Sequence, residues 1–204
     1  MSEIKKIIKK TKNFSDFSKK YFKYLNYVFK KIDDKSFEKL EEELINIRKK
    51  GKTLFVIGNG GSAATSTPMA NDLGFDILKK ASTKKTFKIH SLTDNTSVIT
   101  AISNDVGYEN IFVNQLKIHY EKGDSLLILS ASGNSKNLLK AAKWVNKKSG
   151  KVIGIIGFNG GKLKKLCDIY VHLKTEKGDY GPVEDLQLVI NHILAHWFQE
   201  KLKK

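Results

Sequence analysis

The sequence predicts an α/β fold in which a parallel sheet of five strands, flanked by helices in the doubly wound arrangement, follows an N-terminal helical extension. Two observations carry this prediction. From Lys52 onward, short apolar runs alternate with longer amphipathic segments, which is the pattern of repeated strand–helix units. One such run, 55–57, ends in the glycine-rich turn 58–61 and leads into small polar residues, as a buried strand does where it turns into a helix.

The N-terminal part of the chain is expected to be helical. Apolar positions between Phe14 and Val28 recur at alternating steps of three and four residues. This spacing predicts an amphipathic helix with an aromatic-rich face, which could pack on its own domain or on another subunit. A second helix is predicted over 36–50. We therefore divide the chain into N-terminal helices that serve packing or oligomerisation, 1–50, and a ligand-binding domain, 51–204.

The rest of the chain supplies the sheet and the helices that cover it. Strands are predicted at 53–57, 87–91, 125–130, 152–156 and 169–173. Helices are predicted at 62–79, 95–104, 109–121, 136–147 and 182–202. Because strands and helices alternate, the sheet is expected to be parallel with helices on both faces, and ligands in such sheets bind beyond the carboxyl ends of the strands.

The turn after the first strand has the composition of an anion-binding loop. Gly58, Gly60 and Gly61 allow the backbone to approach a ligand closely. Ser62 can cap the following helix and offer a hydroxyl, and the unpaired N–H groups of a helix N-terminus favour an anion. Taken alone, such a loop is also compatible with a turn that binds nothing.

A second loop of the same kind follows the third predicted strand. Ser130, Ser132 and Ser135 can each donate to a phosphate oxygen, and the backbone at Gly133 and Asn134 can add N–H donors. A serine-rich turn alone is often an ordinary helix cap, but two such loops in one domain favour a ligand. Neither loop has the Gly-Lys-Ser/Thr ending of a Walker sequence. A single sugar phosphate therefore fits better than a nucleoside triphosphate with magnesium.

Acidic and histidine side chains near these loops are candidates for the chemistry. Asp94 follows the second strand, where a carboxylate can bind sugar hydroxyls, although it could equally cap a helix. Glu184, His192 and His196 are spaced by multiples of four residues along the last helix and so share one stripe. A glutamate and a histidine there could form an acid/base pair facing a sugar phosphate, or the histidines could be core residues. The spacing alone leaves both open.

The composition excludes several classes of protein. The net charge is +16, from 37 basic and 21 acidic residues, yet Arg48 is the only arginine. Since nucleic-acid readers rely on arginine, we expect a lysine-rich surface that attracts anionic substrates and no specific nucleic-acid partner. Cys167 is the single cysteine, so no internal disulfide can form. No apolar run is long enough to span a membrane and no signal-peptide core is present, so we expect a cytoplasmic protein without a membrane partner.

Three segments of the chain resemble the sugar isomerase (SIS) domain family. They are Gly58-Asn59-Gly60-Gly61-Ser62-Ala63, Asn104-Asp105-Val106-Gly107-Tyr108 with Phe112, and Ser130-Ala131-Ser132-Gly133-Asn134-Ser135. More narrowly, they look like phosphoheptose isomerase, which interconverts sedoheptulose 7-phosphate and a heptose 7-phosphate. The resemblance runs from about residue 15 onward, and it is more specific for the fold and for phosphosugar binding than for the substrate.

The resemblance implies a five-stranded parallel sheet and a homotetramer, or else a homodimer, with active sites at subunit contacts. Its phosphosugar substrate would undergo aldose–ketose isomerisation through an enediol. His192 would be the general acid, and Asp72 stands at the position of the family's general base, a glutamate. The substrate and its phosphate would be bound by Asn59, Gly60, Ser62, Asp94, Ser130, Ser132, Asn134 and Ser135.

The chain departs from the family pattern at several positions. Pro68 stands where the family has a zinc-binding histidine, and a proline cannot bind a metal. Asp72 shortens the glutamate, Glu184 replaces a glutamine, and Gly181 replaces an aspartate. Asp72, Glu184 and His192 could still hold Zn²⁺ as a three-ligand site. Equally, Glu184 could have become the base with no metal, and the changes also suggest a substrate other than the usual heptulose phosphate.

Two functions of different classes follow from the resemblance. The first is a phosphosugar isomerase, most directly on sedoheptulose 7-phosphate for surface-polysaccharide heptose, with Glu184 and His192 as usable acid/base groups. The second is a non-catalytic SIS scaffold that binds the replication initiator DnaA or another protein, as a relative of these isomerases does. Lost catalysis would fit the altered Pro68, Asp72 and Gly181. A phosphosugar-sensing regulator is disfavoured, since the N-terminal segment lacks a clear helix-turn-helix.

Overall fold

The computed structural model describes residues 2–83 and 85–203, and it contains the predicted parallel sheet. Its five strands lie in the order β2-β1-β3-β4-β5, and every neighbouring pair is parallel. The strands are β1 (Thr53–Ile57), β2 (Lys88–Ser91), β3 (Ser125–Ser130), β4 (Lys151–Gly157) and β5 (Ile169–Leu173). Each strand starts and ends within one residue of its prediction, so the predicted sheet is confirmed.

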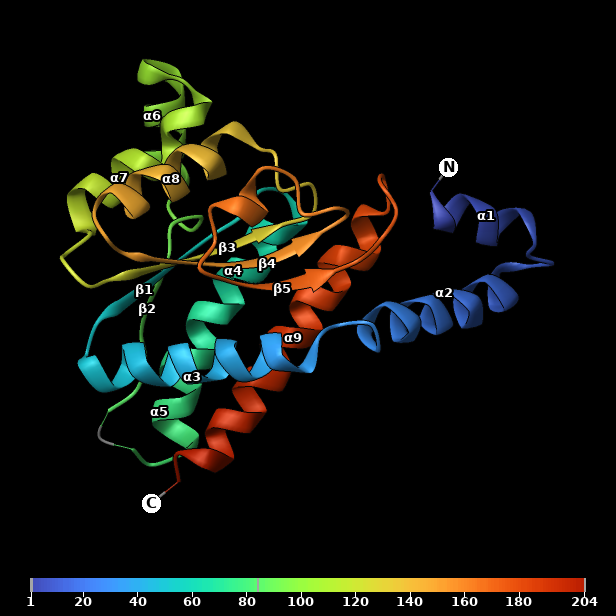
Figure 1. The fold of residues 1–204 in the computed structure, drawn as a ribbon, viewed down its shortest axis with the longest axis horizontal. Helices are drawn as coiled ribbons and strands as arrows, with labels where there is room; N and C mark the ends of the chain where they lie inside the picture. Colours follow the sequence, from blue (N-terminus) through green and yellow to red (C-terminus); the bar gives the residue numbers. More distant parts are fainter. Residues whose placement is uncertain (1, 84, 204) are drawn as a thin grey trace.

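Helices cover both faces of the sheet, with α3, α4 and α9 on one face and α7 and α8 on the other (Figure 1). The helical elements are α1 (Glu3–Lys9), α2 (Phe14–Phe29), α3 (Asp34–Lys50), α4 (Gly61–Asn71), η1 (Asp72–Asp76), α5 (Ile77–Lys80), α6 (Thr96–Val106), η2 (Tyr108–Asn110), α7 (Ile111–His119), α8 (Lys136–Lys147), η3 (Leu163–Lys165) and α9 (Tyr180–Lys201). The strand order reverses its direction of winding between β1 and β3, and ligands bind at this point in such sheets. Within the described ranges, none of the helices combines the length and the apolar character that crossing a membrane requires.

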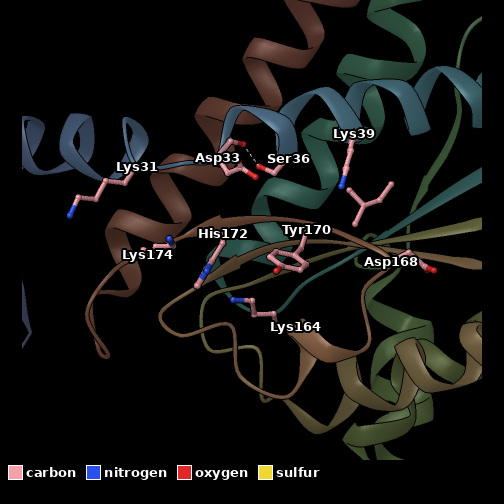
Figure 2. Close-up of a pocket in the computed structure, with 10 residues that line it drawn as sticks. Lys31, Asp33, Ser36, Lys39, Lys164, Asp168, Tyr170, His172 and Lys174 are labelled. Carbon is pink, nitrogen blue, oxygen red and sulfur yellow. Dashed lines mark hydrogen bonds between the residues drawn. The ribbon is translucent and has the colours of Figure 1, made fainter.

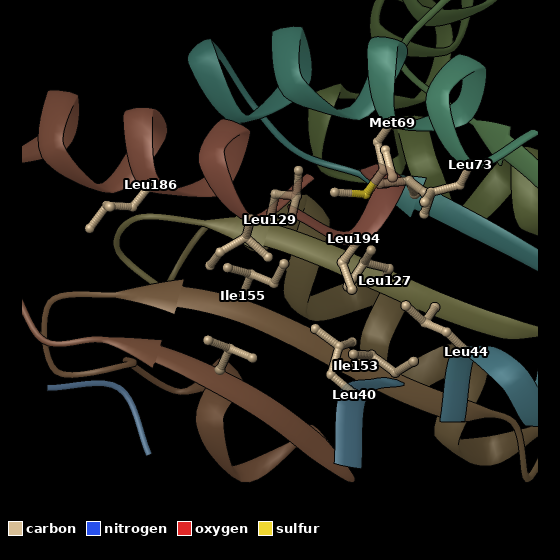
Figure 3. Close-up of a cluster of buried hydrophobic side chains, with 14 of the residues drawn as sticks. Leu40, Leu44, Met69, Leu73, Leu127, Leu129, Ile153, Ile155, Leu186 and Leu194 are labelled. Atoms are coloured by element: carbon tan, nitrogen blue, oxygen red, sulfur yellow. The ribbon is translucent and has the colours of Figure 1, made fainter. Parts of the chain in front are cut away.

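The hydrophobic core forms one cluster on each face of the sheet. On the face covered by α3, α4 and α9, Leu40 and Leu44 of α3 pack with Met69 of α4 and with the strand residues Leu127 and Ile153 (Figure 3). All five side chains are fully buried, and full burial of a side chain of this size stabilises the fold by roughly 1.5–3 kcal/mol. The helix α3 therefore covers the sheet as an integral part of the core.

The helix predicted over 62–79 is interrupted. In the structure, α4 is followed by a single π-helical turn, η1, and then by α5. Pro68 lies inside α4, where it removes one N–H donor from the backbone hydrogen-bond ladder. Insertions of a π turn are frequent at functional sites and are one recognised cause of helix kinks. As a result, Asp72 lies where the helical register changes.

The N-terminal helices α1 and α2 extend away from the sheet (Figure 1), and Asp179 ties them to the rest of the molecule. The buried carboxylate of Asp179 accepts hydrogen bonds from the backbone N–H of Glu3 at 2.9 Å and of Ile4 at 3.4 Å. It also accepts one from the hydroxyl of Tyr24 at 3.2 Å. A carboxylate is favourable at a helix N-terminus, and Asp179 is also the residue before α9. The N-terminal helices α1 and α2 (the N-terminal arm) are therefore attached to the molecule at Asp179, next to the start of α9.

Candidate active site

The two predicted ligand loops lie side by side, because they leave paired strands at the same edge of the sheet. Ile57 at the end of β1 lies opposite Ile128 of β3. The side-chain amides of Asn59 and Asn137 exchange two hydrogen bonds, 3.0 Å from Asn59 Nδ2 and 2.8 Å from Asn137 Nδ2. The hydroxyl of Tyr108 also donates to Asn59 Oδ1, at 2.9 Å. The loops that were predicted separately thus form one hydrogen-bonded unit.

The second loop arranges serine hydroxyls that can donate to a ligand. Ser130 Oγ accepts the backbone N–H of Gly133 at 3.0 Å, and Ser132 Oγ accepts that of Asn134 at 3.2 Å. A hydroxyl that accepts one hydrogen bond still carries its own proton, so both serines can donate to a phosphate oxygen. Ser135 is the N-cap residue of the twelve-residue helix α8, and its side chain makes no capping hydrogen bond. The positive end of α8 therefore adds to the attraction for an anion.

The serine loop rests on the loop that follows β4. Asn134 Nδ2 donates within its own loop at 2.9 Å, and its Oδ1 accepts the backbone N–H of Lys162 at 3.1 Å. Gly133 has a φ of +63°, and a Cβ there would lie 2.1 Å from the carbonyl oxygen of Gly160. The N–H of Leu163 donates to the Gly133 carbonyl at 2.9 Å. The side chain of Asn134 therefore shapes the loop, in which Ser132 and Ser135 are half-buried and Ser130 is buried.

In the first loop, Ser62 is buried and already hydrogen-bonded. Its hydroxyl donates to Gln187 Oε1 on α9 at 2.7 Å, and Gln187 Nε2 donates to the Ile155 carbonyl at 3.0 Å. In this structure the hydroxyl proton of Ser62 is therefore donated to Gln187 of α9 and not to a phosphate. Gly60 forms the exposed tip of the loop, with a φ of +56°.

Glu184 of α9 lies against the N-terminus of α4. A Cβ at position 61 would come within 2.4 Å of the Glu184 carboxylate, so Gly61 is required for this approach. The backbone of Gly61 acts to lower the pKa of the carboxyl group. Burial, followed by the charge of Asp185, nevertheless raises the pKa of Glu184 above its ordinary value. The structure therefore provides an acidic group with an elevated pKa beside the first loop.

Asp72 lies at the opposite end of α4. It follows Ser62 by ten residues, which corresponds to about 15 Å along a helix. Asp72 Oδ2 accepts a hydrogen bond from Asn191 Nδ2 of α9 at 2.7 Å, and Oδ1 accepts one from Asn71 Nδ2 at 3.1 Å. Asn191 is buried, and its Oδ1 has no hydrogen-bond partner in the described part of the chain. The structure therefore holds Asp72 against α9, well away from the two loops.

His192 faces outward from α9. Both His192 and His196 are exposed, so the interpretation of these histidines as core residues is wrong. They lie in a shallow depression with the exposed apolar side chains of Val189, Ile193 and Trp197. Nothing from the two ligand loops lines this depression. His192 is therefore presented on an apolar surface of the chain and away from the loops of the same chain.

The three predicted zinc ligands, Asp72, Glu184 and His192, do not fit one metal ion within the chain. Glu184 and His192 are eight residues apart on a continuous helix, which is about 12 Å, whereas zinc ligands lie about 2 Å from the metal. In residues 2–83 and 85–203, no three His, Cys, Asp or Glu side chains are arranged to hold a metal. The predicted set is corrected on this ground: α9 keeps two of its members too far apart.

Asp94 lies beside α4 at the carboxyl end of β2. Its Oδ1 accepts a hydrogen bond from the hydroxyl of Thr67 at 2.7 Å. It does not cap the following helix, because Asn95 is the N-cap of α6 and accepts the N–H of Val98 at 3.1 Å. The alternative role of Asp94 as a helix cap is therefore excluded, and its exposed carboxylate remains available to a ligand.

Sequence reasoning missed several polar residues that organise the site. Asn137 and Gln187 are buried polar residues on otherwise apolar helix faces, which is the signal that could have found them. Tyr108 belongs to a segment that the resemblance includes, but its contact with Asn59 joins parts of the chain that are 49 residues apart. Nothing in the local pattern predicts a contact of that kind.

Comparison with known proteins agrees with this geometry. The sequence model of the SIS domain matches residues 20–157. A phosphoheptose isomerase from Rhodospirillum rubrum is 35% identical over 157 residues, covering 77% of this chain and 80% of its own. One from Helicobacter hepaticus is 37% identical over 158 residues, with 78% of each chain covered. One from Nitratiruptor is 33% identical over 177 residues, covering 81% and 92%.

Solved structures show the same fold. The phosphoheptose isomerase of Neisseria gonorrhoeae superposes with a TM-score of 0.78 at 23% identity, covering 91% of this chain and 96% of its own. That of Francisella tularensis gives a TM-score of 0.78 at 21% identity, covering 93% and 100%. At these identities the structures establish the fold, and the sequence relatives establish the group. The chain belongs to the SIS domain family, among its phosphoheptose isomerase-like members.

Proposed function

We propose that the protein is a phosphosugar aldose–ketose isomerase whose substrate is sedoheptulose 7-phosphate. The observation that carries this proposal is the pair of joined loops, in a chain that is 33–37% identical to three phosphoheptose isomerases. The activity for which these relatives are named supplies the substrate class. The loops supply the chemistry that a terminal phosphate needs.

The phosphate is held by the serine loop in this proposal. Ser130, Ser132 and Ser135 donate their hydroxyl protons, and the N-terminus of α8 contributes a positive partial charge. Asn59 and Asp94, which flank the loops, contact the hydroxyls of the sugar chain. Gly60 contributes a backbone N–H group, and Asn134, whose own N–H is bonded to Ser132 Oγ, shapes the loop around the phosphate. Ser62 keeps its bond to Gln187 and fixes the first loop against α9.

Glu184 is the carboxylate best located to transfer the proton. Its carboxylate lies against Gly61. A Cβ at Gly157 would meet both the side chain of Val183 in α9 and the carbonyl of Ala131 in the serine loop, so α9 lies beside that loop as well. A pKa raised toward neutrality suits a general base. Glu184 would remove a proton from C1 of the ketose, giving an enediol, and return it to C2. Asp72 is the competing base, from the opposite end of α4.

The general acid, His192, would come from a second copy of the chain. It lies on an exposed apolar surface with Val189, Ile193 and Trp197, and such surfaces mark association sites. We propose a homotetramer in which this surface of one copy brings His192 to the loops of another. His192 would move the hydroxyl proton between O1 and O2 while the carboxylate moves the carbon-bound proton.

No step of this mechanism uses a metal. Pro68 cannot act as a ligand, and Glu184 and His192 of one chain are too far apart for one ion. The residues of one chain therefore do not fit the zinc that the family resemblance implies.

The test is incubation with sedoheptulose 7-phosphate in heavy water, with and without a chelator, followed by NMR. We expect deuterium at the carbon next to the carbonyl together with new aldose signals, and unchanged rates in chelator. Loss of activity in chelator would contradict the metal-free mechanism. If neither this substrate nor shorter phosphosugars exchange, the isomerase proposal fails, and the non-catalytic scaffold that binds a protein such as DnaA takes its place.

A further inference from the structure

A second polar pocket lies at the outer edge of the sheet, on the edge strand β5. It has a volume of about 300 Å³, at the lower end of the range for small-molecule sites. Its walls come from the end of α2, the start of α3, η3, β5 and the residue after β5 (Figure 2). None of the residues assigned to the substrate or to proton transfer lines it.

Four lysines line this pocket: Lys31, Lys39, Lys164 and Lys174. The ammonium group of Lys31 points away from the pocket (Figure 2) and donates to the hydroxyl of Tyr27, so three lysines remain to meet a ligand. Across residues 2–83 and 85–203, none of the four forms an ion pair with a carboxylate. Of the two acidic residues in the lining, Asp168 is already engaged, since it accepts the Val152 N–H at 2.9 Å and pairs with Lys151 at 3.4 Å. The four lysines of the lining outnumber its two aspartates, Asp33 and Asp168, so the pocket carries a net positive charge.

The floor of the pocket contains His172 and Tyr170 of β5. The ring of His172 contacts the Phe158 carbonyl through Nε2 at 2.9 Å. Lys164 Nζ lies 5.2 Å from the centroid of the Tyr170 ring. Burial, followed by the positive charges of Lys164 and Lys174, lowers the pKa of His172. An anion between these lysines would reverse the second effect and turn His172 into a further donor.

The alternative explanation is that lysines protect an edge strand from pairing with another chain. Protective lysines lie in the edge strand itself, but β5 contains none. The lysines of the lining instead come from the turn after α2, from α3, from η3 and from the segment after β5. Lys39, Lys164 and Lys174 belong to three separate segments and line one cavity, which favours a ligand.

We infer that this pocket binds a small phosphorylated anion, held by Lys164 and Lys174 with Lys39 at its rim. The site differs from the serine loops in its chemistry, since it uses ammonium groups where the loops use hydroxyls and N–H groups. The inference does not depend on the proposed isomerase activity.

The pocket is connected to the serine loop through a short segment. His172 holds the Phe158 carbonyl, and Phe158 has a φ of +49°, which is rare for a residue other than glycine. The same segment continues through Gly160 and Leu163, which contact Gly133, to Lys164 in the pocket wall. An anion in the pocket and a phosphate on the serine loop would therefore share one structural support.

Calorimetric titration with pyrophosphate at about 0.15 M salt tests the inference, since diffuse surface attraction is screened there. The titrated protein carries Ser130→Ala and Ser132→Ala, so that the serine loop contributes little. One version adds Lys164→Gln and Lys174→Gln. The matched control adds Lys143→Gln and Lys147→Gln, which remove the same charge from exposed positions of α8 outside the pocket.

We expect the pocket pair to weaken pyrophosphate binding at least about tenfold and the control pair to change it by less than about twofold. NMR of the His172 ring supplies a second readout: pyrophosphate should raise its pKa only when Lys164 and Lys174 are present. If the pocket variant and the control variant weaken pyrophosphate binding equally, binding depends on overall charge and the inference is wrong. Absence of binding to the protein that keeps all its lysines would overturn it as well.

Discussion

Asn59 and Asn137 exchange paired side-chain hydrogen bonds of 3.0 and 2.8 Å across the two loops. Each amide satisfies the donor and the acceptor of the other, so this contact fixes the spacing between the glycine-rich turn and the helix that follows the serines. A substrate whose phosphate is bound at one loop and whose carbon chain crosses the other depends on that spacing.

A double-mutant cycle measures this contact. Asn59→Ala and Asn137→Ala should each destabilise the fold, and the pair should show a coupling energy of about 1 kcal/mol. Asn137→Ala should also lower kcat/KM, although Asn137 is not assigned to the substrate. Chemical unfolding and steady-state kinetics of the three variants provide the numbers. Additive effects within error would mean that the two loops are positioned independently.

Substitution of the two candidate bases should distinguish them. Glu184→Gln should reduce deuterium exchange at least about 100-fold, because it removes a general base while preserving shape. Asp72→Asn should reduce exchange by less than about tenfold, since Asp72 lies about 15 Å along α4 from Ser62. The reverse order of effects would assign the proton transfer to Asp72, in line with the family position.

The raised pKa of Glu184 also predicts a dependence of stability on pH. The folded state binds the Glu184 proton more tightly than the unfolded state, so this group lowers stability as pH rises from its ordinary value of 4.5 through its higher folded pKa. Glu184→Gln removes that loss. The variant should be more stable than the parent at neutral pH, and the difference should disappear below pH 4.5. Urea unfolding on both sides of this window tests the sign; a parent more stable at neutral pH would contradict it.

Turnover at one site should require His192 from a neighbouring copy of the chain. His192→Ala should lower turnover at least about 100-fold, while His196→Ala, which alters the next histidine of the same exposed stripe, should change it much less. Neither His192→Ala nor Glu184→Gln alone should be active, but co-refolded mixtures should regain part of the activity because hybrid assemblies combine intact groups. Mixtures that stay inactive would place both groups in one chain. Light scattering reports the assembly in every case.

Asp179 should control the attachment of the N-terminal arm. Asp179→Asn should weaken the hydrogen bonds that residue 179 accepts from the N–H groups of Glu3 and Ile4 and from the hydroxyl of Tyr24. Loss of charge-assisted bonds at a buried position costs about 1–3 kcal/mol, so amide exchange in α1 should accelerate at least about fivefold. Glu176→Gln, an exposed neighbour on the same loop, is the control. Unchanged exchange in α1 would mean that other contacts hold the arm.

Much of the fold follows from local sequence pattern. The apolar runs that became β1 and β3 are bounded by glycine or serine turns, so their limits are sharp. The serine loop was also predictable, since its donors are consecutive in the chain. The interruption of the helix after Asn71 was not predictable. Pro68 indicates a disturbed helix, but the position of the π turn, four residues after Pro68, depends on packing against α9.

The site contacts between distant residues could not be derived from pattern. Glu184 and His192 are related by four-residue spacing, yet the length of the helix prevents them from sharing a ligand. Similarly, Ser62 has the composition of an anion ligand, but a glutamine 125 residues later takes its proton. Whether such a side chain is free for a ligand depends on its tertiary partners. These lie too far along the chain to be found from local sequence.

The contact of Gly133 with Gly160 and Leu163 has an evolutionary consequence. At Gly133 the two loops touch through backbone atoms, and the side chain of Asn134 also bonds the backbone of Lys162. An insertion or deletion between β4 and η3 would therefore be transmitted directly to the serines. Lineages that alter substrate preference in this group are expected to do so by substitution in these loops, while the length of the turn after β4 stays constant.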